Sequence, residues 1–163
     1  MVLFLDFDGV LHEYGAGESN LLRHVPLFAA ILREHTNVDV VVASAWRKTE
    51  TLSQLASHFP YDLNARFVGV TSESQAGLRQ RERECWDWLC AQHRTGEDWI
   101  AIDDNLDNFG PDLPGLGAVL FVDPATGLDE NACLQLRAMI GNPKPGSHFC
   151  YERSTVRGWR LWE

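Results

Sequence analysis

Long apolar runs, paired cysteines and an excess of positive charge are all missing from this chain of 163 residues. No window approaches the roughly 18 apolar residues that a membrane span needs, and the chain does not open with a basic segment followed by an apolar one. The four cysteines form no C-x-x-C pair, so we expect reduced thiols rather than a disulfide framework or a zinc site. These absences indicate a soluble, cytoplasmic protein.

Basic residues are outnumbered by acidic ones. The chain carries 14 Lys and Arg against 23 Asp and Glu, which gives a formal net charge of −9 at pH 7. A protein that coats nucleic acid normally relies on the opposite balance, because it must neutralise phosphates. Any anionic substrate must therefore be held by a local group of positive residues.

Apolar runs typical of buried strands alternate along the chain with helical patterns. We expect five strands: a first one whose apolar residues begin at residue 2 and lead into the two aspartates, then residues 38–43, 66–70, 99–102 and 118–122. We expect helices at residues 21–32, 49–59, 77–93 and 128–140, the last capped by Asp129. This alternation predicts an α/β fold, a Rossmann-like three-layer sandwich with a mostly parallel five-stranded central sheet.

Polar residues follow three of these strands. Ligands bind such sheets outside the carboxyl ends of the strands. That rule places Asp6, Asp8, Ser44, Asp103 and Asp104 in one crevice. Asp6 and Asp8 are two residues apart, so both can point into one small volume, where their charges repel unless a cation lies between them. Oxygen ligands without a histidine or cysteine cluster favour Mg²⁺.

Several motifs resemble one known superfamily. The residues DFDGVL from Asp6 to Leu11 are similar to the D-x-D-G-V-L signature of the haloacid dehalogenase (HAD) superfamily, Ser44 stands at its Ser/Thr position, and Asp103-Asp104 looks like its acidic fourth motif. More narrowly, FLDFDGVLH, SAWR, R-x-x-E-C-W-D-W-L and VDPATGL resemble the HAD domains found in RNA-repair (Swiss Army Knife) proteins. The likeness covers about the first 140 residues.

The resemblance implies roles for the acidic residues. Asp6 would be the nucleophile and a metal ligand, and Asp8 the general acid and base, with its backbone carbonyl also on the metal. Asp103 and Asp104 would complete the Mg²⁺ site directly or through water. Asp107 competes with Asp104 for this place, since the superfamily also uses a second acid a few residues after the first.

The resemblance also implies a substrate-binding group. Ser44 would donate a hydrogen bond to the transferring phosphoryl oxygen, and a Lys or Arg near the start of the helix before the fourth strand would neutralise its charge. Arg79, Arg81 and Arg83 compete for the cationic role, and we favour Arg81, which begins the R-x-x-E pattern. Arg47 follows Ser44 closely and is a further candidate for substrate contact.

Two neighbours of these motifs have structural alternatives. Trp46 either contacts substrate or covers the edge of the sheet. We expect His12, like the other histidines, to be a surface or half-buried residue without a role in the site.

The segments that hold cap domains in related phosphatases are short here. Residues 11–38 hold only a loop and a helix, and residues 47–77 only a helix, a strand and a loop, so we expect no cap domain. An open site suits a large phosphorylated substrate, such as a nucleic-acid end or a protein. We divide the chain into a catalytic domain at residues 1–140 and an extension at 141–163 that packs on the domain or contacts a partner.

Two functions are consistent with these residues. The first is a Mg²⁺-dependent phosphomonoesterase that works through an aspartyl-phosphate. The second is a non-catalytic or phospho-receiver module that binds Mg²⁺ and a phosphate without turnover. The presence of both Asp6 and Asp8 favours the enzyme, because a binder needs no second carboxyl group to move protons.

Overall fold

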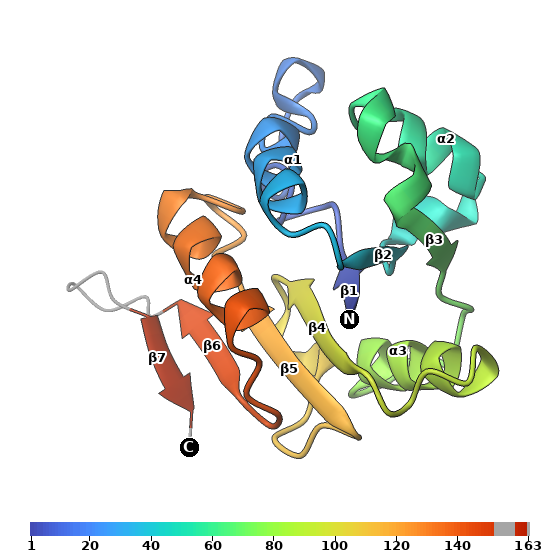
Figure 1. The fold of residues 1–163 in the computed structure, drawn as a ribbon. Helices are drawn as coiled ribbons and strands as arrows, with labels where there is room; N and C mark the ends of the chain where they lie inside the picture. Colours follow the sequence, from blue (N-terminus) through green and yellow to red (C-terminus); the bar gives the residue numbers. More distant parts are fainter. Residues whose placement is uncertain (152–158, 163) are drawn as a thin grey trace.

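The structure, a computed structural model, describes residues 1–151 and 159–162, with side chains as far as residue 149. Its strands form one sheet in the order β3-β2-β1-β4-β5-β6-β7 (Figure 1). Their bounds are β1 Val2–Leu5, β2 Asp39–Val42, β3 Phe67–Val70, β4 Asp98–Asp103, β5 Leu116–Phe121, β6 His148–Tyr151 and β7 Trp159–Trp162.

The sheet confirms the expected fold class, with a mostly parallel α/β architecture. Strands β1 to β6 pair in parallel, and β7 pairs antiparallel with β6 at the edge. The expected count of five strands was too low, because β6 of the C-terminal extension continues the sheet beyond β5 and β7 follows it. Residues 152–158 of the expected extension at 141–163 lie outside the described residues. The division at residue 140 stays a prediction.

The observed helices are shorter than the ranges expected from their apolar patterns. Their bounds are α1 Val25–Glu34, α2 Leu52–Ser57, α3 Gln80–Ala91 and α4 Glu130–Gly141, with 3₁₀ turns η1 Glu18–Asn20, η2 Ala45–Lys48, η3 Tyr61–Arg66 and η4 Leu106–Asn108. Leu22 and Arg79 have φ of +59° and +58°, a left-handed conformation that no α-helix contains, so α1 and α3 begin after them. Thr51 rather than Thr49 caps α2, and Asp129 caps α4 as predicted.

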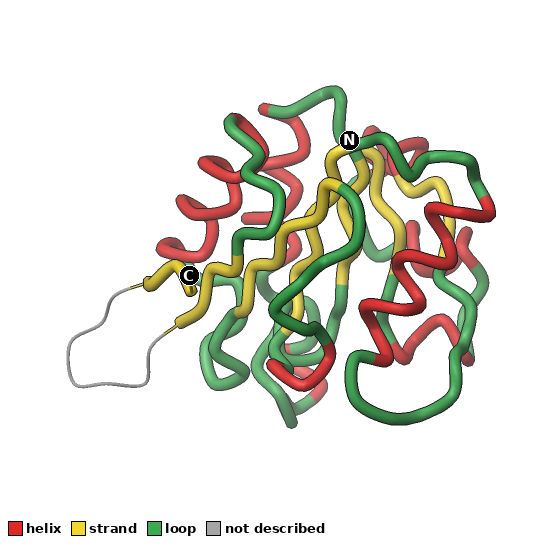
Figure 2. The backbone as a smooth tube through the Cα atoms, turned by 90° about the horizontal axis from the view of Figure 1, so that it is seen from below, coloured by secondary structure: helices red, strands yellow, loops and turns green. Residues whose placement is uncertain are grey.

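Helices cover both faces of the sheet (Figure 2). Leu3 and Leu5 of β1 point into a core that residues of α1, α2 and α4 complete. Val2 and Phe4 alternate with them and pack on the other face, against α3 residues such as Trp88. Since successive side chains of a strand point to opposite faces, β1 contributes to the cores on both sides of the sheet. Its carboxyl end is then available for a site.

No cap domain interrupts the described part of the fold. Residues 11–38 hold η1 and α1, and residues 47–77 hold the second half of η2, then α2, η3 and β3. Both α-helices contribute side chains to the core. Within residues 1–151 and 159–162, no helix has the length and apolar character to cross a membrane.

Candidate active site

The carboxyl ends of β1 and β4 bring three acidic side chains together. The strands are neighbours with Leu5 opposite Ile102, so Asp6 and Asp103 lie at the same level. The backbone N–H of Asp6 donates to the carbonyl of Ile102 at 3.2 Å. Ligand atoms of Asp6, Asp103 and Asp104 all lie within 4.8 Å of one another, and we call these three residues the acidic group.

Burial makes the negative charges of the acidic group costly. Asp6 is 8% exposed and Asp103 only 1%. Burial, followed by repulsion from Asp6, raises the pKa of Asp103 to about 8 and that of Asp104 to about 6. Burial also raises the pKa of Asp6, against the opposing effects of the Arg81 charge and of hydrogen bonds from the Phe7 N–H and the Ser44 hydroxyl. These carboxylates therefore need a cation to be ionised together.

The loop after β4 orients Asp103. Its Oδ1 accepts hydrogen bonds from the Asn105 backbone N–H at 2.8 Å and from Asn108 Nδ2 at 2.9 Å. These contacts aim the carboxylate and were not expected from the sequence, although Asn105 and Asn108 stand close behind the acidic motif. Asp107 is exposed and outside the acidic group, and its backbone carbonyl accepts from the Arg79 N–H at 2.8 Å. The structure thus brings Asp104, and not Asp107, next to Asp6.

Asp8 belongs to a different set of contacts. Its side chain is 41% exposed and is not a member of the acidic group. Trp46 Nε1 lies 3.1 Å from Oδ1 and 3.0 Å from Oδ2, and His12 Nε2 lies 3.1 Å from Oδ1. His12 is only 2% exposed, so the expectation of a surface or half-buried histidine was wrong. The backbone N–H groups of Val10 and Leu11 donate to the Phe7 carbonyl, and this turn brings His12 next to Asp8.

Ser44 lies at the carboxyl end of β2, next to β1. It is fully buried, caps η2, and its Oγ accepts from the Trp46 backbone N–H at 3.4 Å. Its hydroxyl is also among the groups that oppose the rise in the pKa of Asp6. The structure therefore brings this predicted phosphate-contacting residue to the acidic group.

Arg81 is the arginine that faces the acidic group. Its Nε lies 3.8 Å from Asp103 Oδ2, is buried, and has no hydrogen-bond partner among the described residues. Burial would lower its pKa, but the charges of Asp6, Asp103 and Glu84 more than offset this, so the pKa is raised. Arg79 lies against Gly110, and Arg83 donates to the backbone carbonyls of residues 75 and 78. A positive group with a free donor thus stands beside the carboxylates.

The guanidinium group of Arg47 is hydrogen-bonded to other residues of the protein. Its three nitrogens donate to the carbonyl of Thr71 at 2.9 Å, the carbonyl of Ser44 at 2.6 Å and Glu84 Oε2 at 2.9 Å. Its side chain is 3% exposed. Arg47 therefore ties together the ends of β2 and β3, and the predicted contact with substrate stays a prediction.

Glu84 joins the two arginines and was not identified from the sequence as part of the site. It has no exposed surface, and its Oε2 accepts from Arg47 Nη2 at 2.9 Å and from Arg81 Nη1 at 2.8 Å. Its Oε1 accepts from the Ser74 backbone N–H and Gln80 Nε2. Burial opposes ionisation, but these hydrogen bonds and charges outweigh it and lower the pKa of Glu84. The R-x-x-E spacing was the available signal, because it places both residues on one face of α3.

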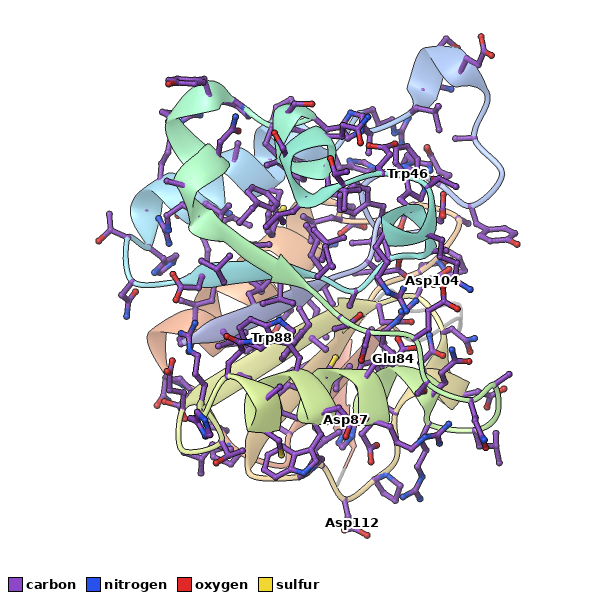
Figure 3. The ribbon with its side chains drawn as sticks, turned by 90° about the vertical axis from the view of Figure 1, so that its right-hand side faces the viewer. Trp46, Glu84, Asp87, Trp88, Asp104 and Asp112 are labelled. Atoms are coloured by element: carbon purple, nitrogen blue, oxygen red, sulfur yellow. The ribbon has the colours of Figure 1, made fainter. Side chains whose placement is uncertain are left out.

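Figure 3 shows the site from the side of α3. Trp46, Asp104 and Glu84 lie along the end of the sheet where the strands finish, whereas Trp88 lies further back, where α3 packs on the sheet. Asp87 and Asp112 lie away from this edge. The site is thus built on one edge, from the ends of β1, β2 and β4 and the first turns of α3.

Comparison with known proteins gives one family match. The family model described as "HAD domain in Swiss Army Knife RNA repair proteins" matches residues 2–133. No curated protein matches the chain. One solved crystal structure is similar with a TM-score of 0.44 and 14% sequence identity, over 86% of this chain and 80% of that chain. The matched range spans the positions of Asp6, Asp8, Ser44, Arg81 and Asp103-Asp104.

Proposed function

The chain belongs to the family of HAD domains found in Swiss Army Knife RNA repair proteins, and from that premise we propose that it is a Mg²⁺-dependent phosphomonoesterase. Its family is part of a superfamily of hydrolases. The observation that carries the proposal is the acidic group, with ligand atoms within 4.8 Å of one another beside the unpartnered Nε of Arg81. Carboxylates this close together suit a metal ion, and the guanidinium of Arg81 beside them suits a phosphate bound next to that ion.

The residues of the acidic group fit Mg²⁺. They offer carboxylate oxygens, which this ion prefers, and their raised pKa values reflect burial and, after it, repulsion from Asp6, both of which a divalent cation offsets. Asp6, Asp103 and Asp104 would hold the ion, with the backbone carbonyl of Asp8 as a further ligand that the family resemblance implies. When bound, Mg²⁺ supplies positive charge that offsets the charge of the substrate phosphate and of the carboxylates.

In the first half of the reaction, Asp6 attacks phosphorus. A carboxylate oxygen of Asp6 forms a bond to phosphorus while the bond from phosphorus to the leaving oxygen breaks, and its electron pair goes to that oxygen. Asp8, as a carboxylic acid, gives its proton to the leaving oxygen, which departs as an alcohol. Ser44 and Arg81 hold phosphoryl oxygens and offset their charge. The product of this half is an aspartyl-phosphate on Asp6.

In the second half, water attacks the phosphorus of the aspartyl-phosphate. The Asp8 carboxylate takes a proton from the water as the new bond forms. The bond between phosphorus and Asp6 breaks, and its electron pair returns to the carboxylate. Inorganic phosphate leaves, and both aspartates are restored to their starting states.

The open edge of the sheet supports a large substrate. Residues 1–151 contain no domain that would enclose the acidic group, so a phosphate at the end of a long molecule can reach it. The family's description points to an RNA end as the first substrate to try, and a phosphoprotein is the second. We also propose a cytoplasmic location, since Cys85, Cys90 and Cys133 are free thiols.

A substrate screen on wild type beside Asp6→Asn tests this function. We expect release of phosphate from RNA bearing a terminal phosphate, with Mg²⁺ and not with EDTA, and loss of at least about a thousandfold in the variant. No turnover of any ester in a panel of nucleic-acid ends, phosphopeptides and small phosphates would overturn the proposal. A stable, acid-labile phosphoryl group on the wild type without phosphate release would instead identify a phospho-receiver module.

A further inference from the structure

Two ring side chains hold the Asp8 carboxylate from one side. Trp46 Nε1 is within 3.1 Å of both carboxylate oxygens, and His12 Nε2 is 3.1 Å from Oδ1. Neither ring belongs to the acidic group or to the phosphate-binding residues described above. Asp8, which transfers protons in the proposed reaction, is thus held by residues that have no other role in the site described above.

The direction of the Trp46 indole is fixed by its neighbours. Its ring centroid lies 5.4 Å from that of Phe7, 6.0 Å from that of His12 and 5.5 Å from that of His58. His58 Nε2 lies 2.7 Å from Glu50 Oε2, and the Glu50 backbone N–H donates to the Trp46 carbonyl at 3.0 Å. Three elements, the loop after β1, η2 and the end of α2, therefore aim the indole N–H at Asp8.

An indole N–H can only donate a hydrogen bond. A protonated Asp8 therefore cannot direct its O–H at Trp46, and the proton must point elsewhere. His12 lies at Oδ1, which leaves Oδ2 as the oxygen with fewer contacts among the described residues. Together the two rings hold the carboxyl group and leave one oxygen able to direct a proton away from them.

We propose that Trp46 is a positioning residue that, with His12, aims the Asp8 carboxyl group at the leaving oxygen of the substrate. The inference rests on the proposed function and assigns Trp46 to proton transfer rather than to substrate stacking or to covering the sheet. Trp46 itself exchanges no proton. In the first half of the reaction, its effect falls on the step in which the Asp8 O–H bond breaks and the new O–H bond forms on the leaving oxygen, as the bond from that oxygen to phosphorus breaks.

The test compares two leaving groups in wild type and Trp46→Phe. An alkyl phosphate needs a proton on its leaving oxygen, whereas p-nitrophenyl phosphate has a leaving group that departs as an anion. Phenylalanine still offers an aromatic ring to pack on Phe7 but lacks the indole N–H that contacts Asp8. We expect kcat/KM, which reports only on the first half of the reaction, to fall at least about tenfold for the alkyl phosphate and less than about threefold for p-nitrophenyl phosphate.

Trp86→Phe is the matched control, since Trp86 lies on α3 against Gly115 and outside the site. We expect it to change neither rate. Equal losses on both substrates, or no loss on either, in Trp46→Phe would overturn the positioning role while leaving the phosphatase intact. A wild type that hydrolyses neither ester nor any RNA end would overturn the proposed function and this inference with it. If melting shows that Trp46→Phe does not fold, His12→Gln decides by the same ratio of rates.

Discussion

A side chain on Gly9 would collide with Asp104, because a Cβ at residue 9 would lie 2.1 Å from Asp104 Oδ2. Gly9 also has φ of +71°, in the left-handed region. The loop after β1 is thus pressed against the last carboxylate of the acidic group. Glycine at this position keeps that carboxylate in its place.

Gly9→Ala should therefore damage the metal site as well as the fold. Gly15→Ala is the matched control, because Gly15 has φ of +77° but nothing within 4 Å of its Cβ position. Both variants pay about 1 kcal/mol for the left-handed backbone. Only Gly9→Ala should weaken Mg²⁺ activation, measured as the Mg²⁺ concentration at half-maximal rate. Equal Mg²⁺ dependence in the two variants would contradict this.

Much of the fold could be predicted because parallel strands buried on both faces are continuous apolar runs. VLFL of β1 and DVVV of β2 are examples, and the topology of such sheets places their ends at one edge. The number of strands could not be predicted, because β6 reads HFCY and β7 reads WRLW, short segments in a tail of mixed charge. Their pairing with the edge of the sheet depends on tertiary structure rather than on local pattern.

The same contrast holds for the site. Asp6 directly follows β1 and Asp103 is the last residue of β4, so their meeting could be derived from the sequence. The R-x-x-E spacing could link Glu84 to Arg81, but its contact with Arg47 could not be derived, since Arg47 is 37 residues away and nothing in the sequence pairs them. His12 was misjudged because its burial depends on a turn that the sequence marks only by Gly9. Residues that contact one another through side chains alone leave little trace in a single sequence.

Glu84→Gln should destabilise the protein strongly. The substitution keeps the shape of the side chain but removes the buried negative charge that Arg47 and Arg81 share. We expect the free energy of unfolding to fall by about 3 kcal/mol, as measured in urea. KM should also rise in any variant that folds, because Arg81 loses its support.

Glu34→Gln provides the control for this measurement. Glu34 pairs with Arg137 on the surface, where both side chains are in contact with solvent. Exposed pairs contribute little, so we expect no measurable change in stability or KM. A loss in Glu84→Gln no larger than that in Glu34→Gln would show that the buried ion pairs do not support the site.

Asp104→Asn and Asp107→Asn should separate the two candidates for the last metal ligand. Asp104 belongs to the acidic group, whereas Asp107 is exposed in η4. We expect Asp104→Asn to weaken Mg²⁺ affinity about tenfold or more, measured by calorimetry, and Asp107→Asn to leave it unchanged. The reverse order would assign Asp107 to the metal.

The metal-free protein should lose stability as the pH rises. In the folded chain the pKa of Asp103 is about 8, against an ordinary value of 3.8. Between these values the folded protein holds a proton that the unfolded chain has lost. The contribution of Asp103 is therefore fully present below pH 3.8 and is lost as the pH rises through 8.

We expect the melting temperature in EDTA to fall between about pH 5 and about pH 8, and added Mg²⁺ to restore much of the loss at the higher pH, because the ion binds the ionised carboxylates. Asp103→Asn has no proton to lose, so its melting temperature in EDTA should fall less over the same range. Asp112→Asn is the control, because Asp112 is exposed and lies away from the acidic group (Figure 3). A wild type and an Asp103→Asn variant with the same pH dependence in EDTA would show that burial of this carboxylate does not limit the stability of the metal-free chain.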